Sequence, residues 1–112
     1  VNGQLTLGEN IGDSAGVVAA YYAYQHKKAK LNKSEIRLQG LEEFSDNQIF
    51  FMNFAHVFCE NVTPQQTQVL LLDEHPRPEI RIRGSLSNFP EFSATYNCPA
   101  GKGMNPDTKC SL

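Results

Sequence analysis

The sequence predicts a mainly α-helical chain, and three observations lead to this fold class. Helix-start patterns occur at Thr6, Ser45 and Thr63, each followed by a segment that can continue as a helix. One short segment, residues 80–83 (Ile-Arg-Ile-Arg), alternates apolar and basic residues as a strand does. The chain has 112 residues without internal repeats or low-complexity segments. That length allows one domain at most.

The first helix is expected to begin after Thr6 and to run to about Lys30. Thr6 and Glu9 fit a capping box, in which the threonine hydroxyl accepts from the Glu9 amide and the glutamate side chain reaches back. Apolar residues then recur at helical spacing, and they are Ile11, Ala15, Val18, Ala19 and Tyr22.

A second helix is expected from near Ser45, where Gln48 completes another capping box. Its body, residues 49–58, is apolar almost all round, which is typical of a helix buried on most sides. An isolated domain of this size could hardly cover such a helix, so we expect it to pack inside something larger. Thr63 followed by Pro64 predicts a third helix that continues to residue 72.

The remaining segments are expected to be shorter and less regular. Two prolines, Pro76 and Pro78, break regular structure in the loop "DEHPRPE". Residues 80–83 are expected to be extended because of their alternation. A short helix is predicted over residues 90–96, and a turn-rich tail follows it.

Composition and charge exclude several classes of function. The net charge is −2 and the pI is near 5.9, so we expect no nucleic-acid partner. No apolar run approaches the roughly 20 residues that cross a bilayer, so we expect no membrane-spanning segment in this chain. The first residues have no signal-peptide pattern.

The cysteines and the glycosylation motifs indicate an oxidising compartment. The chain has three cysteines, Cys59, Cys98 and Cys110, and no two of them have the CxxC spacing of a zinc knuckle. In an oxidising compartment at least one of them must therefore pair outside the chain. Asn32 and Asn61 begin N-x-[ST] motifs, although Pro64 weakens the second. We expect an extracytoplasmic chain that is part of a larger protein.

Glu9 and Asp13 lie one helical turn apart and are the first candidates for chemistry. A carboxylate in the first turn is most often a cap, and this interpretation is the more common one. The alternative is that Glu9 binds a metal and Asp13 supports it, because a helix N-terminus favours an ionised carboxylate. One carboxylate cannot hold a catalytic zinc, which needs three protein ligands and an open position.

The histidines supply other pieces of a possible site. No H-E-x-x-H pair is present. His26 is interpreted as a solvated residue at a helix end, and His56 as a hydrogen-bonded core or interface histidine. His75 stands in the proline-rich loop with Arg81 six residues on, a pair that could stabilise an oxyanion and bind a carbonyl or a carboxylate. Two solvated polar side chains are the simpler interpretation. No G-x-S-x-G elbow or local cysteine signature supports nucleophilic catalysis.

Several long motifs, in order along the chain, resemble the neprilysin and endothelin-converting-enzyme family of zinc metallopeptidases. The segment "VNGQLTLGENIGDSAG" resembles the family pattern V-N-G-x-L-T-L-G-E-N-I-A-D-x-G-G. The likeness continues through "AYYAYQ", "NQIFFMNFAHVFC", "DEHPRPEIRIRGSLSNFPEF" and "YNCPAGKGMNPDTKC". It implies the C-terminal helical part of a thermolysin-like catalytic domain, covering residues 1–112.

The resemblance implies a role for each candidate side chain. Glu9 matches the third zinc ligand, and an H-E-x-x-H helix upstream would supply two histidine ligands and the general-base glutamate. Asp13 matches the aspartate that hydrogen-bonds a zinc-binding histidine. His75 matches a histidine that stabilises the oxyanion, and Asp73 would orient it. Arg81 matches the arginine that binds a carbonyl of the peptide substrate.

The sequence departs from the family pattern at several positions. Gly12 replaces an alanine, and Phe58 replaces a tryptophan. The usual Ser-Pro-Gly after the histidine is Pro-Arg-Pro at residues 76–78, and Arg83 adds a charge that we place on the same strand face as Arg81. The family ends in C-x-x-W, whereas this chain ends in Cys-Ser-Leu.

The function implied is hydrolysis of internal bonds in small extracellular peptides by a zinc endopeptidase. The three cysteines, Cys59, Cys98 and Cys110, would pair with cysteines earlier in the polypeptide. The protein would be secreted or the ectodomain of a type II membrane protein, and this chain alone would be inactive. The alternatives are a catalytically inactive ectodomain that acts as a binding module and a free-standing small helical domain. An intact upstream H-E-x-x-H would favour the enzyme over the binding module.

Overall fold

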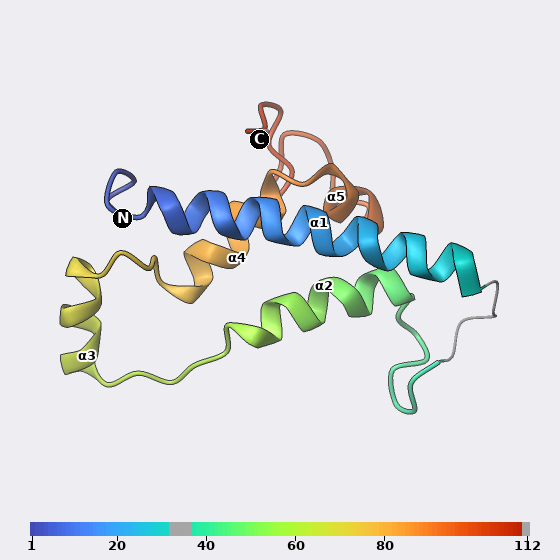
Figure 1. The fold of residues 1–112 in the computed structure, drawn as a ribbon, viewed down its shortest axis with the longest axis horizontal. Helices are drawn as coiled ribbons and strands as arrows, with labels where there is room; N and C mark the ends of the chain where they lie inside the picture. Colours follow the sequence, from blue (N-terminus) through green and yellow to red (C-terminus); the bar gives the residue numbers. More distant parts are fainter. Residues whose placement is uncertain (32–36, 111–112) are drawn as a thin grey trace.

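The computed structural model describes residues 1–31 and 37–110 of the chain, and it confirms the mainly α-helical fold (Figure 1). The described part contains five α-helices and one short 3-10 helix. In chain order these are α1 (Leu7–Leu31), α2 (Asp46–Val57), α3 (Pro64–Val69), η1 (Leu70–Leu72), α4 (Pro78–Ser87) and α5 (Pro90–Thr95).

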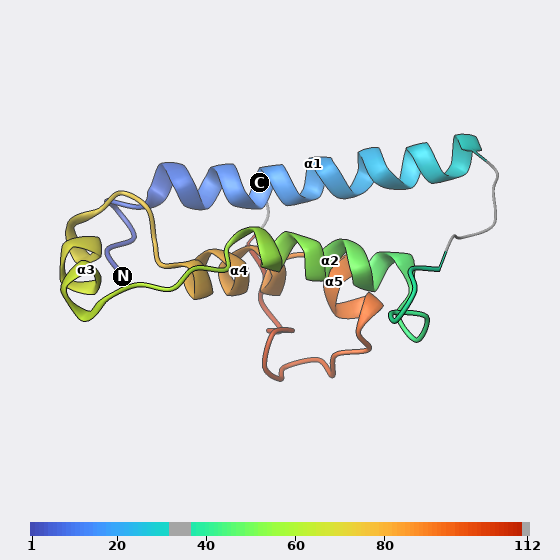
Figure 2. The same cartoon turned by 90° about the horizontal axis from the view of Figure 1, so that it is seen from below.

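The helices form two layers, which Figure 2 shows from the side. The long helix α1 is one layer, and α2, α4 and α5 form the other. Helix α1 packs against α4, and α5 contacts both α2 and α4. The short α3 lies apart from these contacts, at the end of the molecule where α1 begins (Figures 1 and 2).

A small aromatic core joins the two layers. Its buried members are Val17 and Tyr21 of α1, Phe51 of α2, Leu86 of α4, and Phe89 directly before α5. The Tyr21 ring stacks on Phe51 with centroids 5.3 Å apart, and Phe89 meets Tyr21 edge-on at 5.3 Å. Such aromatic pairs add to the free energy of burial of the rings.

The molecule is less compact than a domain of this length normally is. Its radius of gyration is 15.9 Å, compared with about 13 Å for a compact domain of about 100 residues. Large apolar side chains are exposed on several elements; Val57 is 73% exposed and Leu72 is 85% exposed. The core is therefore small for the amount of apolar surface that the chain carries.

All three predicted helix starts are confirmed, since α1, α2 and α3 begin directly after Thr6, Ser45 and Thr63. The Ser45 hydroxyl accepts from the Gln48 backbone N–H at 3.3 Å, and the Gln48 side chain accepts from the Ser45 backbone N–H at 2.8 Å. This is the complete capping box that the sequence predicts. The Thr63 hydroxyl accepts from the Gln66 backbone N–H at 3.2 Å, next to Pro64 at the start of α3.

The capping box predicted at Thr6 is wrong in its partners. The buried Thr6 hydroxyl donates to the backbone oxygen of Asn2 at 3.1 Å and accepts from the Asn10 side chain at 3.0 Å. Asn2 also accepts from the backbone N–H of Gln4 at 3.1 Å, so the residues before α1 form an asparagine turn. The Glu9 carboxylate is thereby left available for contacts elsewhere.

The extended segment predicted at residues 80–83 is also wrong, because these residues belong to α4. Pro78 occupies the first turn of α4, where its missing N–H costs nothing, and the N–H groups of Ile80 and Arg81 donate to the Arg77 oxygen. Residues two apart lie on nearly opposite sides of a helix. Arg81 is therefore partly buried while Arg83 is exposed, and they share no strand face.

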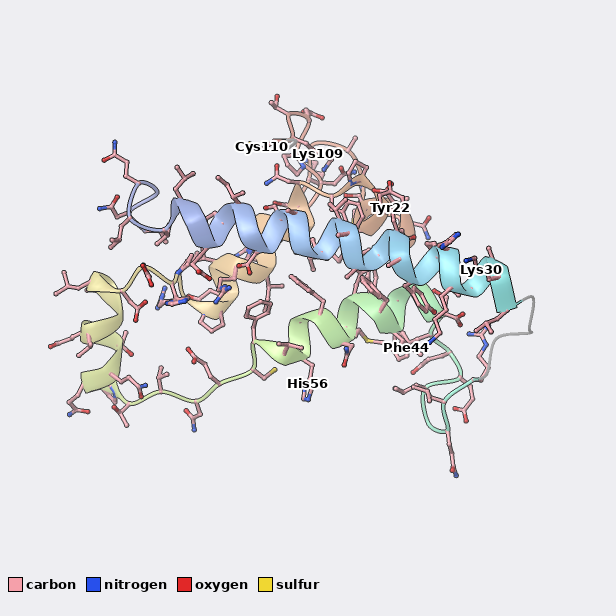
Figure 3. All side chains as sticks on the ribbon, in the orientation of Figure 1. Tyr22, Lys30, Phe44, His56, Lys109 and Cys110 are labelled. Carbon is pink, nitrogen blue, oxygen red and sulfur yellow. The ribbon has the colours of Figure 1, made fainter. Side chains whose placement is uncertain are left out.

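Helix α2 is less buried than its apolar sequence predicts. Phe51 is the fully buried residue of α2, and Val57 at its end is largely exposed. His56 is exposed and points away from α1 (Figure 3), so the core interpretation of this histidine is wrong. Phe50 and Phe54 pack against the core beside Phe51, whereas His56 and Val57 are exposed in the part of the chain that the structure describes.

Candidate functional site

Helices α1 and α4 bring three charged side chains together at one end of the molecule. The Arg81 guanidinium donates to Asp13 through two nitrogens, with Nε to Oδ2 at 2.6 Å and Nη2 to Oδ1 at 2.7 Å. The same Nη2 donates to Oε2 of Glu9 at 2.9 Å. The two carboxylates are one turn apart on α1, so one planar guanidinium can span both of them.

Arg81 is held firmly in this position. Its side chain is 19% exposed, and that of Asp13 is 10% exposed. The Phe58 ring at the end of α2 lies 4.9 Å from the guanidinium carbon, a cation–π distance. The hydrogen bonds to Asp13 raise the pKa of Arg81 above its usual value, and the charge of Glu9 adds to this effect. The arginine is therefore charged throughout the working range of pH.

His75 lies beside this cluster in the loop before α4. Its ring Nδ1 is 2.7 Å from Oδ1 of Asp73, and its backbone N–H donates to the same oxygen at 2.8 Å. The ring Nε2 is 3.6 Å from Oε1 of Glu9. The hydrogen bond to Asp73 raises the pKa of His75, and the N–H groups of His75 lower the pKa of Asp73. Asp73 thus fixes one ring nitrogen and directs the other toward Glu9.

A pocket of about 260 Å³ opens next to these side chains. It lies between the end of α2 and the loop that leads into α4. Its walls are formed by residues 57–60, residues 75–78 and Arg81. His75 and Arg81 therefore line the same cavity.

The described residues contain no group of three or more His, Cys, Asp or Glu side chains that could hold a metal ion. Glu9 is the side chain whose chemistry fits a ligand. Its carboxylate is partly exposed; Oε2 accepts a hydrogen bond from Arg81, and Oε1 faces His75. Asp13 uses both of its oxygens for Arg81. The donor set fits one ligand of a zinc ion and requires further ligands from outside these residues.

The other residues singled out in the sequence do not join the site. Cys59 and Cys110 are exposed, Cys98 is partly exposed, and no disulfide links the three in the described part of the chain. Asn61 is exposed in the loop before α3, as a glycosylation site must be. Asn32 lies outside the described residues. None of the described helices is long and apolar enough to cross a membrane.

Sequence reasoning missed the contacts that Arg81 makes with Glu9 and Asp13. Arg81 lies 68 positions from Asp13 and 72 positions from Glu9, so no local spacing links it to either residue. The error over residues 80–83 hid the relation further, because a strand would not place Arg81 on the first turn of a helix packed against α1. The signal that could have found it is Pro78, which is typical of a helix start.

Comparison with known proteins supports the resemblance. The sequence model of peptidase family M13 matches residues 1–112. An endothelin-converting enzyme homolog from Locusta migratoria is 45% identical over the whole chain, neprilysin-3 from Drosophila melanogaster 41%, and human endothelin-converting enzyme 1 46%. The chain spans 15%, 14% and 14%, respectively, of the lengths of these relatives.

Proposed function

The chain belongs to peptidase family M13, and from this membership we propose that it forms part of the active site of a zinc metalloendopeptidase. In this proposal it supplies one zinc ligand and the groups that bind the peptide. The substrates would be small extracellular peptides, cleaved at internal bonds. The protein would act outside the cell, either secreted or attached to the cell surface.

One observation carries the proposal. The side chains that the family resemblance singles out, Glu9, Asp13, His75 and Arg81, come from segments far apart in the sequence and meet at one place. Nothing in helix packing alone requires an acidic pair, an arginine and an oriented histidine to gather beside a pocket. Such convergence of titratable groups is typical of functional sites.

Each side chain has a role that its contacts suit. Glu9 would hold the zinc together with two histidines from a segment outside this chain, and Asp13 would support these ligands. A zinc ion bound there would polarise the substrate carbonyl and lower the pKa of a bound water. As the imidazolium ion, His75 would donate through Nε2 to the developing oxyanion while its Nδ1–H donates to Asp73. Arg81 would bind a peptide carbonyl and hold the substrate in register.

The rest of the polypeptide is the partner that this role requires. We propose that it contributes the H-E-x-x-H helix, covers the exposed apolar side chains of α2, and pairs with Cys59, Cys98 and Cys110. The exposed position of Cys59 and Cys110 suits such pairing. The large exposed apolar surface suits burial against further elements.

The ligand role is tested by Glu9→Gln in the complete protein that carries this chain. The amide keeps the shape of the side chain but is a poor zinc ligand, so we expect loss of bound zinc and of nearly all peptidase activity. Glu43→Gln is the matched control, because Glu43 is exposed and far from the site along the chain. Zinc content is measured by atomic absorption. Normal zinc content and turnover in the Glu9 variant would contradict the assignment.

A second test concerns the 112-residue chain on its own. We expect no cleavage of a fluorogenic peptide after zinc is added, because the chain carries one proposed ligand and no H-E-x-x-H general base. The complete protein, assayed in parallel, serves as the positive control. Turnover by the chain alone that depends on zinc and stops on adding a chelator would overturn the proposed division of the site.

A further inference from the structure

Arg81 has more partners than a substrate-binding arginine requires. We propose that it is also a positioning residue for the metal-binding carboxylate, so that its loss weakens zinc binding as well as peptide binding. This inference rests on the proposed function, because it assumes that Glu9 is a zinc ligand. The guanidinium would hold Glu9 and Asp13 in fixed orientations before a metal or a peptide arrives.

The donor count of the guanidinium supports two separate roles. Arginine has five N–H donors, and three of them are used on the carboxylates. Nε and Nη2 bind Asp13 side-on, and the second N–H of Nη2 binds Glu9. The two N–H groups of Nη1 have no hydrogen-bond partner among the described residues. One edge therefore holds the carboxylates, and the other edge is free for a peptide carbonyl.

The contact with Glu9 also determines which of its oxygens is free. Oε2 accepts from Arg81, whereas Oε1 faces His75 at 3.6 Å and accepts no short hydrogen bond from the described residues. Oε1 is therefore the oxygen available to a cation. Without Arg81, two carboxylates one turn apart would repel each other, and the Glu9 side chain, 35% exposed, would turn freely. Ordering it on metal binding would then cost free energy.

Arg81 can act in this way because it is itself fixed. Its backbone lies in the first turn of α4, where its N–H donates to the Arg77 oxygen and its own oxygen accepts from the Ser85 hydroxyl at 2.8 Å. The Phe58 ring covers one face of the guanidinium. A lysine would keep the charge, but it is a point charge and cannot make the side-on pair with Asp13. Shape as well as charge is therefore required.

The test measures the zinc affinity of the complete protein by competition with a chromogenic chelator. We expect Arg81→Ala to raise the zinc Kd by about 10- to 100-fold, the usual effect of removing a partner of a metal ligand. Arg81→Lys should recover only a small part of this loss. Arg83→Ala is the matched control on the same helix, because Arg83 is exposed, and we expect its Kd to stay within about twofold of the wild type. If Arg81→Ala does not fold, Arg81→Gln is measured in its place.

The outcomes separate this inference from the proposed function. If wild-type protein binds zinc, Glu9→Gln does not, and Arg81→Ala binds as tightly as wild type or more tightly, the inference is wrong and the function stands. If Arg81→Lys binds as tightly as wild type, charge alone suffices and the inference about geometry is wrong. If the wild-type protein binds no stoichiometric zinc, the proposed function itself fails.

Discussion

Two segments of α1, residues 9–13 and residues 17–21, have different roles. The first segment carries Glu9 and Asp13 and is joined to α4 by charge-assisted hydrogen bonds to Arg81. The second segment carries Val17 and Tyr21 and is joined to α2 and α4 through the aromatic core. One rigid helix therefore connects the residues that stabilise the fold to the residues that we propose for the chemistry.

The difference between the two segments lies in how well water is excluded from their side chains. Val17 and Phe51 are almost completely buried, whereas Glu9 and His75 are between a third and a half exposed. Burying an apolar side chain stabilises by about 1.5–3 kcal/mol, but a partly exposed ion pair contributes much less. Substitutions in the core should thus change stability, and substitutions at the site should mainly change binding.

The largest expected effect is in the core. Phe51→Ala removes the ring that stacks on Tyr21 and meets Phe92 edge-on at 5.4 Å. We expect the free energy of unfolding to fall by about 3–5 kcal/mol, as for other buried aromatic residues. Hydrogen–deuterium exchange of the α1 and α2 amides in the complete protein measures the loss as faster exchange. Val57→Ala is the control on the same helix; because Val57 is 73% exposed, it should change exchange little. Equal effects of the two variants would show that this core does not hold the helices.

A smaller stability effect is expected at the site end. Asp13→Asn replaces one acceptor oxygen with an NH₂ group that faces the guanidinium of Arg81. Because both side chains are mostly buried, we expect the free energy of unfolding to fall by about 1–3 kcal/mol. Amide exchange in α4 should quicken while that of α2 stays unchanged. Glu43→Gln, an exposed acid-to-amide change, is the control. Faster exchange throughout α2 would mean that the two segments of α1 are not independent.

Sequence reasoning predicted the core end of the molecule better than the site end. Helix starts at Ser45 and Thr63 are read from local side-chain chemistry, and local chemistry decides them in the structure too. The contact of Arg81 with Asp13 spans 68 positions, so no local pattern in the sequence links the two residues. Only the family resemblance assigns both of them to one site. The strand prediction at residues 80–83 failed because four alternating residues fit a helix equally well once Pro78 begins it.

The capping box of α2 tests how much a local signal contributes. Ser45→Ala removes the hydroxyl that accepts from the Gln48 N–H and leaves that donor to water. We expect a loss of about 1 kcal/mol, the usual cost of removing such a cap. Faster amide exchange should be confined to the first turn of α2. Ser45→Asp keeps an N-cap acceptor and should restore protection; no recovery in that variant would show that the cap does not set the start of α2.

The smallest expected effect comes from a second arginine pair on α4, and it isolates the role of burial. Arg77 and Glu79 form an ion pair with Nη2 and Oε1 2.7 Å apart, as short as the pairing of Arg81 with Asp13. Their side chains, however, are 49% and 51% exposed. Water and salt screen such a pair, so Arg77→Ala should lower the stability of α4 by less than about 0.5 kcal/mol. Amide exchange in α4 measures this change. A loss as large as that of Asp13→Asn would mean that distance, and not burial, sets the strength of the arginine contacts on α4. In that case charge pairing alone would stabilise the site end, and the contrast between the two segments of α1 would need another cause.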